Sequence, residues 1–329
     1  MKLNFRSMVI VLVVGCGAVQ IASAGAPAER APLSDADMKF LAELEARLTI
    51  WREHAASGSG HYPATREQNR SLPTHMIYRP QDLGALKFRL PIILFGNGGC
   101  RNTSIEYTEL LAEIASHGYI VIAVGRNDVD YATTDLDESA RSANGLPVQI
   151  LDPQILTRGL DWILKENLRV GSPYFRKVQA SEVAYMGQSC GGVQALTASA
   201  DPRTRTTVVL NSGYFDASTY EGDFKMPPRV EWSALHAPIA FFIGGPDDIA
   251  YKAAAANFDA IRALPVFEGN LPVGHLGGHY PVPDPRWTRA IVAWLDWQLK
   301  GQLSAKSYFV GPHPTLKDAG WIVKSKNLQ

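Results

Sequence analysis

The sequence has no excess of charge of either sign and no hydrophobic run long enough to cross a membrane. Its 329 residues include 32 Lys+Arg and 32 Asp+Glu, so the formal net charge is zero. Without a summed field to steer it, the protein is not expected to bind nucleic acid or anionic lipid, and a neutral or weakly charged substrate is favoured. The apolar run from Met8 to Val14 is short and is followed by Gly15, Gly17 and Gln20, which argues against a stable membrane span.

Cysteine is also scarce, and one of the three cysteines lies in what we interpret as an export signal. Lys2 and Arg6 precede the apolar run, and Ala22-Ser23-Ala24 has the small-x-small form of a signal-peptidase site. We therefore predict a signal peptide over residues 1–24 and a protein that is periplasmic or secreted. A bacterial lipobox ending at Cys16 is the alternative, and it would leave the protein lipid-anchored at that residue. After cleavage at Ala24 two cysteines remain, and in an oxidising compartment two cysteines suggest one disulfide.

The rest of the chain alternates short apolar runs with helical stretches. Nearly continuous apolar runs are typical of strands that are buried on both faces of a parallel sheet. The helical stretches between them predict an α/β fold, with a mostly parallel central sheet covered by helices on both faces. The runs are His75–Tyr78, Leu90–Phe95, Tyr119–Val124, Val183–Met186, Thr207–Leu210 and Ile239–Ile243, and the helical stretches are Tyr107–His117, Ile155–Glu166, Val193–Ala200, Ala253–Ala263 and Trp287–Lys300.

No internal repeat or second domain is evident, so we predict one catalytic domain over residues 71–329. Residues 25–70 form a polar segment that includes an amphipathic helix, Ser34 to Ala56, with apolar residues at helical spacing. The acidic stretch from Arg126 to Gln149 is interpreted as a surface loop. The alternative is a calcium site, because the spacing of its aspartates resembles that of a calcium-binding loop. We otherwise expect no metal and no organic cofactor.

The strongest chemical signal is Gly187-Gln188-Ser189-Cys190-Gly191, which lies directly after a predicted strand and before a predicted helix. This is the context that the G-x-S-x-G nucleophile motif requires. Glycines permit a turn tight enough to lift the serine hydroxyl above the sheet, while the helix points its positive end at a developing oxyanion. Ser189 is therefore the predicted nucleophile.

A serine nucleophile needs a base, and the base needs an orienting carboxylate. Asp248 follows the apolar run that ends at Ile243 and is the predicted acid, with its neighbour Asp247 as the alternative. His275 lies in a glycine-bracketed loop before the last predicted helix and is the predicted base. His279, in the same loop, is the alternative base.

Two backbone N–H groups are needed to bind an oxyanion. Cys190 follows the nucleophile and is predicted to supply the first. The glycine-rich loop from Gly96 to Cys100 is predicted to supply the second, from Asn97 or alternatively from Gly98. If both loops line one oxyanion hole, Cys100 and Cys190 come within disulfide reach, so we predict that they are bonded.

Together these segments resemble the α/β-hydrolase superfamily, within it the exported dienelactone-hydrolase-like, chlorophyllase-like and polyester-hydrolase-like serine esterases. The resemblance runs from about His75 to Phe309, and it implies Ser189 as nucleophile, Asp248 as acid and His275 as base. The doubled glycine before His279 departs from the pattern and leaves the choice of histidine open. The segments that carry the resemblance are Phe95–Cys100, Ala115–Gly118, Gly187–Gly192, Gly245–Tyr251, Val273–His275 and Trp294–Lys300.

The sequence thus predicts an exported serine hydrolase that cleaves small or polymeric carboxylic esters through an acyl-enzyme. The alternatives are a peptidase or amidase on the same fold, and a secreted binding protein on a hydrolase scaffold that has lost catalysis. Four aromatic residues beside the predicted site could line an acyl or aryl pocket or pack in the core: Tyr214, Phe215, Tyr220 and Trp232.

Overall fold

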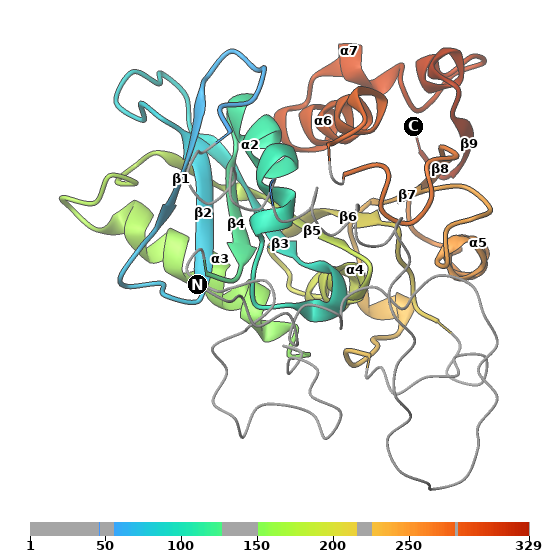
Figure 1. Cartoon of the computed structure of the whole chain (residues 1–329), viewed down its shortest axis with the longest axis horizontal. Helices are drawn as coiled ribbons and strands as arrows, with labels where there is room; N and C mark the ends of the chain where they lie inside the picture. Colours follow the sequence, from blue (N-terminus) through green and yellow to red (C-terminus); the bar gives the residue numbers. More distant parts are fainter. Residues whose placement is uncertain (1–45, 47–55, 127–150, 216–225, 280–281, 329) are drawn as a thin grey trace, which may run out of the picture.

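A computed structural model describes residues 46, 56–126, 151–215, 226–279 and 282–328 of the chain. The predicted signal peptide, Cys16, Tyr220 and the acidic loop except for Arg126 lie outside these residues, as does the predicted helix Ser34–Ala56 except for its residues 46 and 56. Within the described part the protein is α/β, with one nine-stranded, mostly parallel sheet and helices packed against it (Figure 1).

The strand order across the sheet is β1-β2-β4-β3-β5-β6-β7-β8-β9. The six strands from β4 to β8 in this order run parallel, whereas β1, β2 and β9 pair antiparallel with their neighbours at the two edges. The strands are β1 Ala64–Gln68, β2 His75–Pro80, β3 Leu90–Gly96, β4 Ile120–Val124, β5 Val178–Gln188, β6 Thr204–Leu210, β7 Ile239–Ile243, β8 Val266–Asn270 and β9 Ile322–Lys326.

The five helices predicted between residues 107 and 300 are all present, with bounds shifted by up to three residues. Helix α4 begins directly after Ser189, three residues before the predicted start at Val193. The helices are α2 Thr108–Ser116, α3 Gln154–Leu168, α4 Cys190–Ala198, α5 Tyr251–Ala260, α6 Pro285–Lys300 and α7 Leu303–Lys306, with 3₁₀ turns η2 Gly98–Cys100, η3 Ile105–Tyr107, η5 Trp232–Ala234 and η6 Thr315–Ala319.

Alternate residues of each central strand enter cores on opposite faces of the sheet. In β3, Ile93 and Phe95 pack with α2 and α6, whereas Ile92 and Leu94 pack with α3. Helices α4 and α5 cover the same face as α3 farther along the sheet. Two covered faces explain why these strands are apolar at every position.

The sheet extends beyond the predicted strands at both edges. Strand β1 pairs with β2 and begins at Ala64, so the predicted domain boundary at residue 71 falls inside the segment that forms the sheet. Strands β8 and β9 add the other edge. Since β3, β5, β6, β7 and β8 run parallel, their carboxyl ends meet at one edge, where the segments that follow them come together.

Candidate active site

Ser189 occupies a sharp turn between β5 and α4. Its backbone has φ 53° and ψ −123°, a conformation that a non-glycine residue adopts only under constraint. Two backbone approaches make glycine necessary beside it. A Cβ on Gly187 would overlap the carbonyl of Gly191, and a Cβ on Gly191 would overlap the backbone of Gly96. The glycines of the motif therefore permit close contact of strand, turn and helix, and the serine side chain remains part-exposed.

Hydrogen bonds connect Ser189, His275 and Asp248 in series. The Ser189 Oγ lies 3.1 Å from Nε2 of His275, and Nδ1 of His275 lies 2.6 Å from Oδ1 of Asp248. The Asp248 side chain is fully buried and the His275 side chain is 19% exposed, so the carboxylate of the pair is shielded from solvent. Asp247 is exposed. The geometry therefore selects Asp248 and His275 from the two pairs of alternatives.

The Asp248 carboxylate is held by several donors. Its Oδ2 accepts from the backbone N–H of Gly244 at 2.9 Å and from Nδ2 of Asn211 at 2.7 Å, and its Oδ1 accepts from the N–H of Ala250 at 2.9 Å. Burial on its own raises the pKa of Asp248, but the hydrogen bond and charge of His275 and the backbone donors outweigh it, and the pKa lies below its ordinary value. The carboxylate is therefore ionised near neutral pH.

Asn211 is a residue of this arrangement that the sequence analysis missed. It directly follows β6 and is fully buried, with φ 46°. Besides Asp248, its Nδ2 approaches the carbonyl of Gly274 at 3.3 Å, next to His275. The available signal was a polar residue immediately after a buried parallel strand, at the same edge as Ser189.

The loop after β3 lies against the Ser189 turn. The loop has two predicted oxyanion donors, Asn97 and Gly98. The N–H of Gly98 donates to the Tyr107 hydroxyl at 2.9 Å, which favours the N–H of Asn97 as the donor. The Asn97 nitrogen would lie 2.5 Å from a Cβ on Gly191, which puts it beside the turn. Cys190 is the first residue of α4, and the first N–H groups of a helix have no partner within it. Asn97 and Cys190 thus remain the candidate oxyanion donors.

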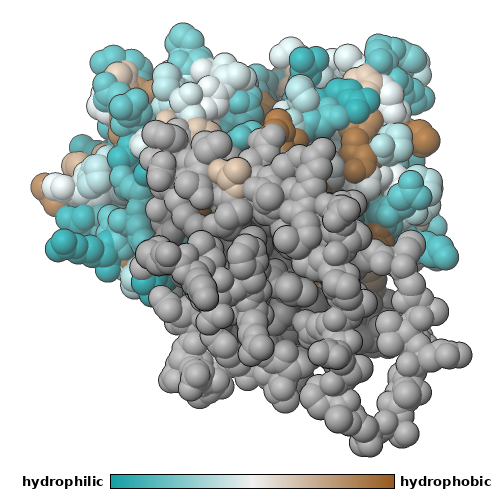
Figure 2. All heavy atoms as spheres, viewed as in Figure 1, coloured by the Kyte–Doolittle hydropathy of each residue, from teal (hydrophilic) through white to brown (hydrophobic). Residues whose placement is uncertain are grey.

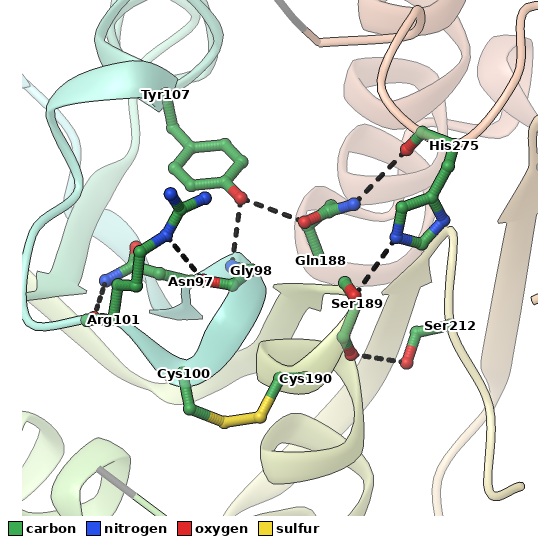
Figure 3. The surroundings of a disulfide bond; sticks show 10 residues. All are labelled: Asn97, Gly98, Cys100, Arg101, Tyr107, Gln188, Ser189, Cys190, Ser212 and His275. Atoms are coloured by element: carbon green, nitrogen blue, oxygen red, sulfur yellow. Dashed lines mark hydrogen bonds between the residues drawn. A yellow bond between two sulfur atoms is a disulfide. The ribbon is translucent and has the colours of Figure 1, made fainter. Parts of the chain in front are cut away.

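Cys100 and Cys190 lie at disulfide-bonding distance, as predicted, with their Cα atoms 5.2 Å apart and 90 residues between them in sequence. Figure 3 shows the sulfur bridge below Ser189, joining the loop after β3 to the first residue of α4. The bridge therefore ties together the two segments that carry Asn97 and Cys190.

His279, the alternative base, is buried at 2% exposure, and it is His275 that contacts the Ser189 hydroxyl. Its ring stacks on Tyr107, with centroids 5.2 Å apart and planes at 22°. Among the described residues its Nδ1 has no hydrogen-bond partner. Burial, followed by the electrostatic effect of the neighbouring His275, lowers the pKa of His279 to about 3. His279 is therefore a neutral imidazole at ordinary pH.

Two further residues that sequence reasoning did not single out for a role lie between the loops. Gln188, the residue before Ser189, accepts a hydrogen bond from the Tyr107 hydroxyl and donates one to the carbonyl of His275. Both side chains are 1% exposed. Their position was not evident from sequence because they come from separate segments.

For Tyr214, one of the four aromatic residues beside the predicted site, the structure decides between lining a pocket and packing in the core. Tyr214 is buried in the core cluster of α4 and α5, and its ring packs on Trp232 with centroids 5.1 Å apart. Its hydroxyl lies 3.1 Å from the Thr197 hydroxyl on α4. Tyr214 therefore packs in the core. Two apolar residues that directly follow site residues in sequence are exposed: Ile249 after Asp248, at 51%, and Leu276 after His275, at 44%.

The visible described surface is mostly hydrophilic, with scattered apolar side chains (Figure 2). Within the described ranges no group of three or more His, Cys, Asp or Glu residues is placed to hold a metal ion. Among the same residues no helix is both long and apolar enough to cross a bilayer.

Comparison with known proteins adds no relative: no family model matches this chain, and no curated protein matches it in sequence. Its function therefore has to be inferred from the side-chain geometry described above.

Proposed function

We propose that this chain is a serine hydrolase of the α/β-hydrolase type that cleaves carboxylic esters through an acyl-enzyme. The observation that carries the proposal is the hydrogen-bonded series from Ser189 through His275 to Asp248. A serine on a strand-turn-helix corner, followed in the chain by an acid and then a histidine, is the arrangement of that fold. The mostly parallel sheet with an antiparallel edge is consistent with it.

The proton positions follow from the partners. Asp248 is ionised and accepts only, so Nδ1 of His275 carries a proton and Nε2 presents its lone pair to the Ser189 hydroxyl. His275 removes the hydroxyl proton as Ser189 Oγ attacks the ester carbonyl, and the imidazolium that forms is stabilised by Asp248. His275 then protonates the leaving alcohol. Water then attacks the acyl carbonyl while His275 takes its proton. His275 returns that proton to Ser189 Oγ as the acid leaves.

The charge that develops on the carbonyl oxygen requires fixed donors. In the proposed mechanism the N–H groups of Asn97 and Cys190 bind this oxyanion. Both belong to segments tied by the Cys100–Cys190 bridge, so they need little reorganisation as charge develops. Removal of one such donor typically slows turnover by about 10²–10³-fold.

An ester with apolar substituents fits the surroundings best. Ile249 and Leu276 are exposed beside Asp248 and His275, and the chain has no net charge to attract an ionic substrate. Small or polymeric esters are both compatible with this rim. The paired cysteines fit the export proposed from residues 1–24, because disulfides persist in oxidising compartments.

The direct test is hydrolysis of p-nitrophenyl acetate and butyrate by purified protein. We expect Ser189→Ala to lower turnover by about 10⁴-fold or more without unfolding the protein. The matched control is Ser199→Ala. Ser199 directly follows α4, and its buried hydroxyl donates to the Leu196 carbonyl of that helix. Hydrolysis by Ser189→Ala at the wild-type rate would overturn the mechanism, and faster cleavage of matched p-nitroanilides would favour an amidase.

A further inference from the structure

A buried chain of hydrogen bonds runs between the loops of the proposed site. The Gly98 N–H donates to the Tyr107 hydroxyl at 2.9 Å, and that hydroxyl donates to Oε1 of Gln188 at 2.9 Å. Nε2 of Gln188 then donates to the carbonyl oxygen of His275 at 3.3 Å. Figure 3 shows the three bonds in sequence, above the disulfide and beside Ser189.

Each bond in this chain has only one possible direction. A backbone N–H can only donate, so the oxygen of Tyr107 accepts from Gly98 and its proton is available for Gln188. A backbone carbonyl can only accept, so the amide nitrogen of Gln188 faces His275 and its oxygen faces Tyr107. Tyr107 and Gln188 are both 1% exposed, so water does not readily replace a lost partner.

The neighbouring residues are shaped around this chain. A Cβ on Gly98 would lie 2.6 Å from the Tyr107 hydroxyl oxygen and would overlap Oε1 of Gln188, so glycine is needed there. The ring of His279 stacks on Tyr107 and fixes the plane of the phenol. The hydroxyl is thereby directed at Gly98 and Gln188.

We propose that Tyr107 and Gln188 are positioning residues for the reaction proposed above, on which this inference rests. Gln188 holds the backbone of His275, and through it the distance from Nε2 to the Ser189 hydroxyl. Tyr107 binds the Gly98 N–H and so sets the orientation of the loop in which the Asn97 N–H acts. The two residues act through His275 and Asn97 and do not contact the reacting atoms.

The test uses Gln188→Met and Tyr107→Phe, which keep most of the side-chain volume and remove the hydrogen bonds. Misplacement of a reacting group by about 1 Å can cost about 10²-fold in rate, so we expect kcat to fall about 10- to 100-fold. KM should change by less than about threefold, since apolar substrate contacts are retained. The double variant should lose little more than the worse single variant, because both substitutions break one chain.

Tyr119→Phe is the matched control. Tyr119 is fully buried at the amino end of β4, away from the site, and its hydroxyl donates to Oδ1 of Asp296 at 2.7 Å. Its loss should lower the melting temperature and leave kcat unchanged. If Tyr107→Phe and Gln188→Met likewise lowered only the melting temperature, the positioning role would be overturned.

A readout independent of turnover separates this inference from the proposed function. The proton on Nδ1 of His275, in its short bond to Asp248, should give a low-field ¹H NMR signal assignable through His275→Ala. We expect Gln188→Met and Tyr107→Phe to shift or broaden that signal, and Tyr119→Phe to leave it in place. A wild-type protein inert to esters would refute the hydrolase, whereas an unchanged signal in both folded variants would refute the positioning role.

Discussion

The Oγ of Ser189 and Nε2 of His275 lie 3.1 Å apart although 86 residues separate them in the chain. Parallel strands bring this about, because β5, β7 and β8 all end at the same edge of the sheet. Ser189 follows β5, Asp248 follows β7 and His275 follows β8. A serine, an acid and a base spaced widely in sequence are thereby in contact in the fold.

The two histidines of this loop should respond differently to removal. We expect His275→Ala to lower ester turnover by about 10⁴-fold or more, since it removes the proposed base. His279→Ala should cost about 2 kcal/mol of stability through the cavity it leaves, and retain turnover within about tenfold. Ester kinetics and urea unfolding of both variants are the measurements. The reverse pattern would make His279 the base.

Asn211 should matter through Asp248. Asn211→Ala leaves an oxygen of the buried carboxylate without its side-chain donor, and we expect kcat to fall about 10- to 100-fold. Asn211→Gly should lower kcat equally but destabilise the protein less, because glycine tolerates the positive φ of 46° without strain. Wild-type kcat in the glycine variant would show that this donor does not affect the reaction.

The cysteine pair should stabilise the fold and the proposed oxyanion loops. A bridge between residues 90 apart is worth about 4–5 kcal/mol in the chain-entropy account. We expect the double variant Cys100→Ala/Cys190→Ala to unfold at lower urea and to turn over ester more slowly. Intact mass before and after alkylation, with and without reduction, reports the bond directly. Two free thiols in unreduced, exported protein would contradict it.

Stability should fall in mild acid because of buried neutral histidines. Burial lowers the pKa of His75 to about 4 and that of His279 to about 3, against 6.5 for the unperturbed group. The unfolded chain binds protons first, so the contribution is complete above pH 6.5, falls as pH drops below 6.5, and is fully lost once pH is below the folded values. His75 alone accounts for about 3 kcal/mol of this loss.

The test is urea unfolding from pH 7 to pH 4.5. We expect His75→Gln to flatten the dependence of unfolding free energy on pH, because its amide can still donate to the Ile155 carbonyl but does not titrate. A slope equal to that of the wild type would exclude His75 as the cause.

Much of the fold could be predicted from the apolar pattern. Strands such as β3 and β7 are covered on both faces, and their continuous apolar runs stand out in the sequence. Strand β1 does not, because at the sheet edge its residues Arg66 and Glu67 are only partly buried. Strand β8 includes the buried polar residues Glu268 and Asn270, and β9 is mostly polar and exposed. A strand at or near the edge of a sheet lacks the signal that two-sided burial imposes.

The candidate site was predicted where local motifs carry it. The glycines around Ser189 were sufficient to select that residue, whereas only coordinates could separate Asp248 from Asp247 and His275 from His279. Tyr107, Gln188 and Asn211 were missed for a physical reason. Each acts through a contact between distant segments, and such contacts leave no pattern within a single stretch of sequence.

In the proposed mechanism His275 makes the Ser189 hydroxyl nucleophilic. The most direct measurement is labelling of the purified protein with a fluorophosphonate probe, followed by peptide mapping and repeated on Ser189→Ala and His275→Ala. We predict one adduct, on Ser189, which is absent in Ser189→Ala and forms far more slowly in His275→Ala. Folded wild-type protein that takes no label at Ser189, or that labels equally fast without His275, would contradict the account.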